Sequence, residues 1–277
     1  MGVGELLRLL QEGGVIDVQN MLDERRIEVD KVGVKNVKYP ICVLDKRQGF
    51  QQTVATIDMF VNLPHNFKGT HMSRFLEILH ENQSTINIKS FPHILLEMKR
   101  RLNAQSAHLR VEFPYFIKKE APVSRSEGYM EYLCAFKGSM DASDRMTEFT
   151  VAVSVPIHTL CPCSKEISTA GAHNQRGVAR VEVKFKRFFW IEDLIEIIEE
   201  SASSGLYSVL KREDEKFVTE RSYNNPKFVE DVARDIAIAL YEKDNFTWFT
   251  IEVENFESIH AHNAYAFIER TKEGGES

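Results

Sequence analysis

Three features are missing from the sequence, and each absence excludes a class of protein. No run of ~18 apolar residues occurs, and the N-terminus lacks the basic-then-apolar pattern of a secretory signal, so neither membrane insertion nor export is indicated. Basic residues also do not outnumber acidic ones. The formal net charge is -6, whereas wrapping nucleic acid requires lysines and arginines that neutralise many phosphates. We therefore predict a cytoplasmic protein that binds neither membranes nor nucleic acid.

Cysteine is scarce, with four residues among 277, which argues against a scaffold held together by disulfides. Cys42 and Cys134 lie in strand-like runs, where a buried thiol behaves as a small hydrophobic group. Cys161 and Cys163 flank a proline in a polar segment. Hydrophobic residues make up 43% of the chain, so we expect a sizeable core in one large domain or two smaller ones.

One pattern of elements occurs twice, in the order strand, strand, helix, helix, strand, strand. Alternating apolar residues predict the strands, and apolar residues at helical spacing predict the helices. The first copy has strands at 32–44, 53–61, 108–117 and 128–136 and helices at 71–80 and 91–102. The second has strands at 148–156, 178–185, 246–253 and 264–268 and helices at 190–198 and 226–240.

This repeat predicts an α+β fold of two tandem ββααββ units, with antiparallel sheets and all helices on one face. We place an N-terminal segment at 1–30, the first unit at 31–140 and the second at 141–277. Such a sheet has exposed edges, and closure into a barrel by self-association would cover them.

The densest polar cluster is residues 160–177, LCPCSKEISTAGAHNQRG, which connects two predicted strands and resembles neither helix nor strand. Long loops in compact domains are usually functional. Cys161 and His173 could meet if this loop folds back, and thiolate and imidazole both bind zinc and related ions. The alternative is a small-residue turn with a hydrogen-bonded histidine, because Cys-Pro-Cys lacks the CxxC spacing of ordinary zinc sites.

A second polar cluster, LKREDEKFVTE at residues 210–220, lies between two predicted helices. A solvated charged connector is the usual explanation for such a segment. The functional alternative is that one carboxylate completes a metal site while the lysines face phosphate. Composition does not choose among Glu213, Glu215 and Glu220.

A third cluster, NFESIHAHNAYA at residues 255–266, contains Glu257, His260 and His262 between the last two strands. Carboxylate and imidazole groups there suit metal ligation or proton transfer, and a polar hairpin with surface histidines is the alternative. Glu230, near the start of the preceding helix, either interacts only with the helix dipole or accepts the N1–H and amino group of a guanine.

Taken in order, these motifs and GTHMSRF at residues 69–75 resemble the type IB GTP cyclohydrolases over residues 34–268. The resemblance implies the tunnelling fold and a homotetramer whose sheets join into a barrel. It implies hydrolytic opening of the GTP imidazole ring, with release of formate and formation of 7,8-dihydroneopterin triphosphate, the first step toward tetrahydrofolate. It further implies a divalent zinc, manganese or ferrous ion and no organic cofactor.

The resemblance also assigns roles to individual residues. It implies metal binding by Cys161, His173, Glu215 and His260, guanine binding by Glu230, and catalysis by Cys161, His173 and Glu257, while Cys163 receives no role. The basic residues near the matched motifs are the candidates for binding the triphosphate: His71, Arg74, Lys165, Arg176, Lys211 and Lys216.

Three other functions compete with this prediction. Tunnelling-fold nitrile reductases would use Cys161 as a covalent nucleophile and would require NADPH. Archaeal cyclohydrolases that share the cysteine and histidine would release a cyclic-phosphate pterin. A structural zinc site in a non-catalytic binding module would have four protein ligands and no open position.

Overall fold

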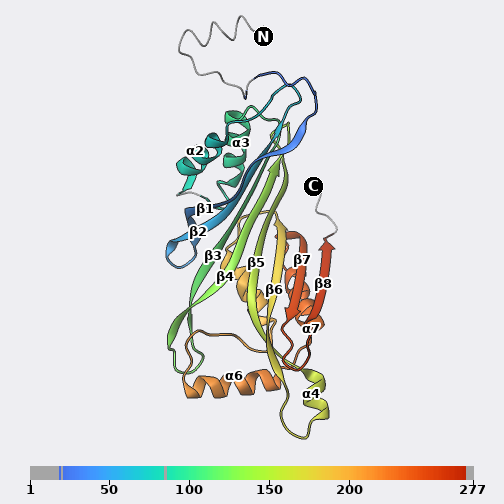
Figure 1. Cartoon of the computed structure of the whole chain (residues 1–277). Coiled ribbons are helices and arrows are strands. Elements are labelled where there is room, and N and C mark those ends of the chain that lie inside the picture. Colours follow the sequence, from blue (N-terminus) through green and yellow to red (C-terminus); the bar gives the residue numbers. More distant parts are fainter. Residues whose placement is uncertain (1–18, 20, 84–85, 273–277) are drawn as a thin grey trace, which may run out of the picture.

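The computed structural model describes residues 19, 21–83 and 86–272 of the chain. Within this part, eight strands form one antiparallel sheet in which each strand pairs with the next along the chain (Figure 1). The strands are β1 (Val29–Asp45), β2 (Gly49–Leu63), β3 (Ala107–Glu120), β4 (Glu127–Met140), β5 (Met146–Leu160), β6 (Asn174–Phe185), β7 (Phe246–Asn255) and β8 (Ala264–Thr271). The helices are α2 (Met72–Asn82), α3 (Phe91–Arg101), α4 (Pro162–Ile167), α5 (Ile191–Glu200), α6 (Arg212–Asn224) and α7 (Val229–Tyr241).

The sheet has one buried face because its strands alternate between apolar and polar residues. In β3, every second residue from Ala107 to Tyr115 is buried, and the residues between them are more exposed. The helices pack on the buried side, which makes the fold α+β as predicted. Among the described residues, no helix has both the length and the apolar character needed to cross a membrane.

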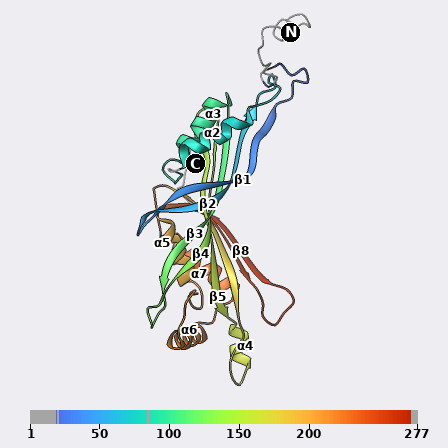
Figure 2. The ribbon, with the colours of Figure 1, turned by 60° about the vertical axis from the view of Figure 1, so that its left-hand side comes forward.

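The helices fall into groups along the sheet (Figures 1 and 2). α2 and α3 cover one end, and α5 and α7 cover the other half, where α7 packs against β7 and β8. α4 and α6 lie at the far end, away from α2 and α3 (Figures 1 and 2). The end of the sheet near α2 and α3 therefore presents different side chains from the end near α4 and α6.

Aromatic side chains form much of the core beneath α3. The Phe91 ring stacks on the Phe149 ring with 5.0 Å between centroids, and it meets the edge of Phe136 at 6.2 Å. Phe91 and Phe136 are both buried, and burial of each such ring stabilises the fold by about 1.5–3 kcal/mol. These contacts join α3 to β4 and β5.

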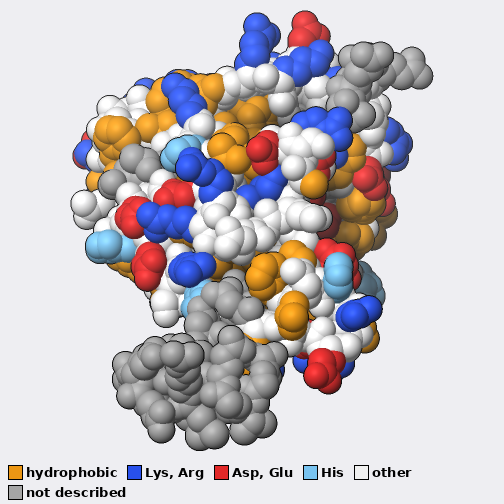
Figure 3. Space-filling model, turned by 90° about the horizontal axis from the view of Figure 1, so that it is seen from above, with side chains coloured by type: hydrophobic (Ala, Val, Ile, Leu, Met, Phe, Trp, Pro, Cys, Tyr) orange, Lys and Arg blue, Asp and Glu red, His pale blue; other side chains and the backbone are white. Residues whose placement is uncertain are grey.

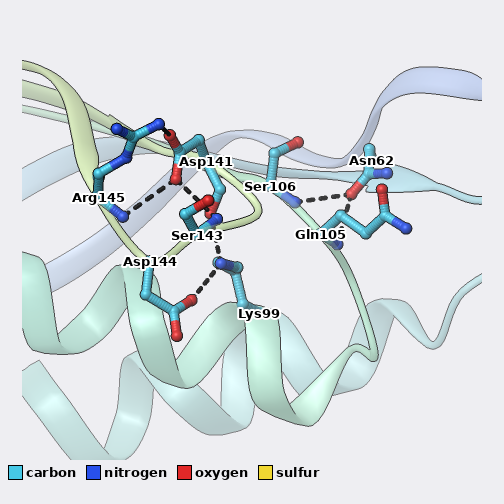
Figure 4. A network of polar contacts seen from close by, with 8 residues as sticks. All are labelled: Asn62, Lys99, Gln105, Ser106, Asp141, Ser143, Asp144 and Arg145. Carbon is cyan, nitrogen blue, oxygen red and sulfur yellow. Dashed lines mark hydrogen bonds and ion pairs between the residues drawn. The ribbon is translucent and has the colours of Figure 1, made fainter.

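Polar contacts fix the turn between β4 and β5 against α3 (Figure 4). The Lys99 ammonium, only 6% exposed, donates to the carbonyl oxygen of Asp141 and forms an ion pair with Asp144. Nearby, the Asn62 side-chain oxygen accepts the backbone N–H groups of Gln105 and Ser106, at 2.8 Å each.

At the end of the molecule seen in Figure 3, acidic and basic side chains are interspersed, and the visible surface has no continuous basic patch.

Three sequence predictions about local structure were wrong. The polar cluster at 160–177 contains a short helix, α4, and its ends belong to β5 and β6. The charged segment at 210–220 is not a connector, because most of it forms α6. The last helix begins at Val229 rather than beside Pro226. No disulfide joins any of the four cysteines, all of which lie in the described residues.

The division into two units stays a prediction. The order of elements contains the expected ββααββ pattern twice, with α4 and α6 as additions. However, β4 and β5 pair across the predicted boundary at residue 140, so both halves share one sheet. Most of the predicted segment 1–30 lies outside the described residues, and β1 begins at Val29.

Candidate functional site

Cys161 and His173 are brought together at the end of β5, because the polar segment folds back on itself. The backbone N–H of Cys161 donates to the carbonyl of His173 at 3.0 Å. Ser164 joins the two residues: its backbone N–H donates to Cys161 Sγ at 3.4 Å, and its hydroxyl oxygen accepts the His173 N–H at 3.1 Å. Cys161 is the N-cap of α4, which orients its half-buried thiol.

The His173 ring makes two polar contacts, and both involve Nδ1. Gln175 Oε1 lies 3.1 Å from this nitrogen, and the Ser258 hydroxyl lies 3.4 Å away. Nε2 is on the opposite edge of the ring and is directed away from these partners. The ring thus presents Nε2 as the nitrogen available to an ion or a substrate.

The loop between β7 and β8 also reaches this corner. Ser258 belongs to it, and the Phe256 N–H donates to the carbonyl of Arg176 at 2.9 Å. Glu257 is half-buried and His260 is exposed. The His260 ring stacks on the His262 ring with 5.1 Å between centroids.

The start of α7 lies beside the same strand end. The backbone N–H of Lys227 donates to the carbonyl of Leu160 at 3.0 Å, directly before Cys161. Asp231 accepts the Phe228 N–H at 2.9 Å, which closes the first turn of α7. Glu230 lies exposed in that turn. Four predicted segments therefore meet at one end of the sheet: the Cys161 segment, the His173 segment, the β7–β8 loop and the α7 start.

α6 is positioned by a buried carboxylate that sequence reasoning did not select. Asp214 is fully buried and accepts backbone N–H groups from Val123 at 2.8 Å, Ser124 at 2.9 Å and Lys211 at 2.8 Å. Burial by itself would raise the pKa of the Asp214 carboxyl, but the Ser124 hydroxyl and these N–H groups outweigh it and hold the pKa well below its usual range. Glu215, the next residue, is exposed.

Glu215 lies away from the Cys161 corner within one chain. α4 contacts the far end of α6, where Lys165 Nζ donates to the carbonyl of Tyr223. Glu215 precedes Tyr223 by eight residues (223 minus 215), which is about 12 Å along a helix. Among the described residues, no group of three or more His, Cys, Asp or Glu side chains is arranged to hold an ion. The predicted four-residue ligand set stays a prediction.

The predicted triphosphate-binding residues are dispersed. Arg176 and Lys165 belong to the segments at the Cys161 corner, and Lys165 lies over the Tyr223 ring at 4.4 Å. Lys211 is the N-cap of α6, and Lys216 lies within that helix. His71 and Arg74 are at α2, on the opposite end of the molecule (Figures 1 and 2).

A cavity of about 720 Å³ lies beside α5, and none of the predicted site residues lines it. Several of its polar groups are paired, since Glu199 accepts from Lys119 at 2.8 Å and from the Tyr132 hydroxyl at 2.6 Å, whereas Glu192 Oε2 is buried without a hydrogen-bond partner in the described residues. Burial, together with Glu199, raises the pKa of that phenol well above its usual range. These pairs join β3 and β4 to α5, which is a structural role.

Sequence reasoning missed the polar residues that support the site, namely Ser164, Gln175, Asn255 and Asp214. For Gln175 and Asn255, the position in the strand's alternating pattern was a signal that the sequence contains. Gln175 is in phase with the apolar inward positions Ala179 and Val181 of its strand, and Asn255 is in phase with its strand's Ile251 and Val253. A polar side chain at an inward position must find a partner inside the protein.

The family model described as "Type I GTP cyclohydrolase folE2" matches residues 15–266. Similar proteins include the GTP cyclohydrolase FolE2 of Syntrophobacter fumaroxidans, 58% identical over 93% of this chain and 100% of the relative. The GTP cyclohydrolase FolE2 of Syntrophus aciditrophicus is 56% identical over 92% of this chain and 100% of the relative.

Among solved structures, the urate oxidase of Bacillus sp. TB-90 is similar with a TM-score of 0.53 and 10% identity, covering 88% of this chain and 100% of that one. The uricase of Bacillus fastidious has a TM-score of 0.54 and 7% identity, covering 88% and 93%. At such low identity these structures support the fold alone.

Proposed function

The chain belongs to the type I GTP cyclohydrolase folE2 family, and on that premise we propose how its residues act on GTP. The enzyme is a hydrolase that opens the imidazole ring of GTP. Water adds at C8, a ring C–N bond breaks, and a second water releases the carbon as formate. The ribose then opens and rearranges to a ketone, and the amino group freed by loss of formate condenses with that ketone. This condensation expels one water and gives 7,8-dihydroneopterin triphosphate, which leads toward folate. The observation that carries the site assignment is the hydrogen-bonded pairing of Cys161 with His173.

Glu230 binds the guanine in this proposal. Its exposed carboxylate lies in the first turn of α7, and the Lys227–Leu160 hydrogen bond holds that turn beside the Cys161 corner. Guanine presents N1–H and the exocyclic amino group side by side, and a carboxylate accepts both donors at once. This contact would orient C8 without taking part in the bond changes.

The donor chemistry of the corner fits a divalent ion. The Cys161 thiol is held at the start of α4 by the Ser164 N–H, and the printed contacts of the His173 ring are at Nδ1, which leaves Nε2 for an ion. Cys161, His173, Glu215 and His260 would hold the ion, and this mixed S, N and O set suits zinc, manganese or ferrous iron. When bound, such an ion would supply Lewis acidity that lowers the pKa of a water molecule to about 7. No organic cofactor is required.

His173 and Glu257 move protons in this proposal. Nε2 of His173 lies on the ring edge away from Gln175, so it can take a proton from the attacking water if it is not bound to the ion. Glu257, half-buried on the β7–β8 loop, can relay that proton from His173 to the departing ring nitrogen. Lys165 and Arg176 belong to the segments at the Cys161 corner and would face the triphosphate.

We infer that a neighbouring copy of the chain supplies Glu215. The carboxylate is exposed, and it lies about 12 Å along α6 from the residue that α4 contacts. The unpaired edges of β1 and β8 also leave the sheet open to association. We therefore propose two tandem tunnelling-fold units, at 31–140 and 141–277, that assemble as a homotetramer with a shared barrel. A cytoplasmic location, where its four free thiols stay reduced, suits this enzyme.

The activity is tested by incubating purified protein with GTP and Mn²⁺ or Zn²⁺ and measuring formate and the fluorescent oxidised pterin. We expect both products, loss of both with EDTA, and recovery on adding metal. Mass spectrometry separates the linear triphosphate from a cyclic-phosphate product. Unchanged GTP with every metal would contradict the proposal, and activity that survives EDTA would favour a covalent role for Cys161.

Shared sites are tested by mixing two inactive variants, Cys161→Ala and Glu215→Gln. If the two residues act from different copies, co-expression places one intact cysteine opposite one intact glutamate and restores part of the activity. If they act within one chain, every site in the mixture lacks one of them. No recovery in a mixed oligomer verified by mass spectrometry would therefore refute the shared site.

A further inference from the structure

Three polar side chains lie together on the buried face of the sheet next to His173. Thr159, Gln175 and Asn255 are at or near the ends of β5, β6 and β7, and they are 0%, 6% and 2% exposed. Thr159 is opposite Gln175 in the β5–β6 register, and Asn255 is opposite Gly177 in the β6–β7 register. The sheet therefore places one polar residue from each of three adjacent strands in a single buried group.

Hydrogen bonds within this group set the orientation of the Gln175 amide. Gln175 Nε2 donates to Thr159 Oγ1 at 2.9 Å, and Asn255 Nδ2 donates to the same oxygen at 2.8 Å. With both lone pairs of the hydroxyl oxygen occupied, Thr159 cannot accept further donors. Since the Gln175 nitrogen points to Thr159, its oxygen points to His173 Nδ1, 3.1 Å away.

This orientation decides which nitrogen of His173 carries hydrogen. An amide oxygen can only accept, so a hydrogen bond with Gln175 requires Nδ1–H. The neutral ring must then have its lone pair on Nε2, the nitrogen that does not contact Gln175 or Ser258. Histidines that bind metals commonly have the other ring N–H donated to a fixed acceptor in this way.

The backbone makes room for this arrangement at Gly177. A Cβ at that position would lie 2.5 Å from Asn255 Oδ1 and 2.5 Å from the Glu254 carbonyl oxygen. Asn255 Oδ1 is itself buried with no hydrogen-bond partner in the described residues, which is unfavourable. What Asn255 contributes is its Nδ2–H, which goes to Thr159.

We propose that Gln175, held in place by Thr159, is a positioning residue that keeps His173 in the Nδ1–H form with its lone pair on Nε2. The inference deepens the proposed function, because it concerns the same histidine. It assigns a role to the QRG end of the loop motif: Gln175 orients the ring, and Gly177 leaves space for the Asn255 amide, which occupies the second acceptor position of Thr159.

The test is the tautomer of His173, measured by long-range ¹H–¹⁵N correlation on the whole apo protein with labelled histidine. The His173→Asn variant identifies its signals among the nine histidines. We expect Nδ1–H in the unchanged protein and a shift toward Nε2–H, the form favoured by free imidazole, in Gln175→Leu. Thr159→Val, which releases the Gln175 amide, should shift the tautomer in the same direction.

Ser258→Ala is the matched control, because Ser258 is the other neighbour of Nδ1 and lies outside the buried group. It should leave the tautomer unchanged. Nε2–H in the unchanged protein would overturn the proposal, and so would an unaltered tautomer in both Gln175→Leu and Thr159→Val. Either variant, if folded, is sufficient for the test.

Zinc affinity, measured by competition with a chromogenic chelator, is the second readout. Loss of a group that orients a ligating histidine typically weakens metal binding by about 10–100-fold, and we expect that range for Gln175→Leu. Unchanged affinity would overturn the positioning role. The tautomer is observed without metal or GTP, so failure of the proposed function, seen as no formate from GTP, remains distinguishable from failure of this inference.

Discussion

Replacing Gly177 with alanine should destabilise the protein mainly through an overlap with the backbone of β7. The new Cβ would lie 2.5 Å from the carbonyl oxygen of Glu254, where ordinary contacts are 3.4–4 Å. That oxygen belongs to the β7 backbone, which pairs with β6, so it cannot rotate away as a flexible side chain would. Overpacking of this kind costs about 1–3 kcal/mol, and each kcal/mol lowers Tm by about 2–4 °C in a chain of roughly this size.

The assay is urea unfolding followed by circular dichroism, with Gly69→Ala as the matched control. The nearest atom to a Cβ on Gly69 would be Gln19 Cγ at 3.4 Å, and the Gln19 backbone would lie 3.8 Å away, which are ordinary contacts. Because alanine restricts the unfolded chain, Gly69→Ala should leave the free energy of unfolding unchanged or raise it by about 0.4–1 kcal/mol. The reasoning is refuted if Gly177→Ala is as stable as the unchanged protein and the control.

Three further predictions concern other groups. Asp214→Asn should destabilise the protein near neutral pH. Because the folded-state pKa of the Asp214 carboxyl lies below its ordinary value of 3.8, the stabilisation is complete above pH 3.8 and is lost as the pH falls toward the folded-state pKa. In unfolding curves, the difference in free energy of unfolding between the variant and the unchanged protein should therefore be smaller at pH 3 than at pH 7. Lys272→Met removes the ammonium that donates to three carbonyls at the end of α7, so it should lower the free energy of unfolding by about 1 kcal/mol in urea titrations. An unchanged urea midpoint would refute a stabilising role for these hydrogen bonds. Burial raises the pKa of the Cys134 thiol, so a maleimide should label exposed Cys163 and spare Cys134 in native protein, as read by peptide mass spectrometry; equal labelling would contradict the burial.

The sequence predicted elements whose stability comes from apolar burial. The alternation from Ala107 to Tyr115 and the stripe containing Phe91 and Met98 match β3 and α3 because their inward residues are apolar. α6 was missed for the opposite reason. Its buried residues, Asp214 and Ser222, are polar, so hydrophobic periodicity does not reveal it.

The site was predictable only where its residues are close in sequence. Cys161 and His173 meet through a short folded-back segment, which their spacing allowed. The distance of Glu215 from that pair depends on how α6 is anchored by Asp214, and a linear pattern carries no signal for that anchoring. Gln175 was predictable in principle, because a polar residue at an inward strand position requires a partner.

The central claim is that the Cys161 thiolate binds the catalytic ion, and X-ray absorption at the zinc edge of the metal-loaded protein tests it most directly. We predict one sulfur scatterer at about 2.3 Å together with nitrogen and oxygen scatterers. The sulfur should disappear in Cys161→Ala and remain in Cys163→Ala. A zinc site with only nitrogen and oxygen ligands in the unchanged protein, or sulfur retained in Cys161→Ala, would contradict the account.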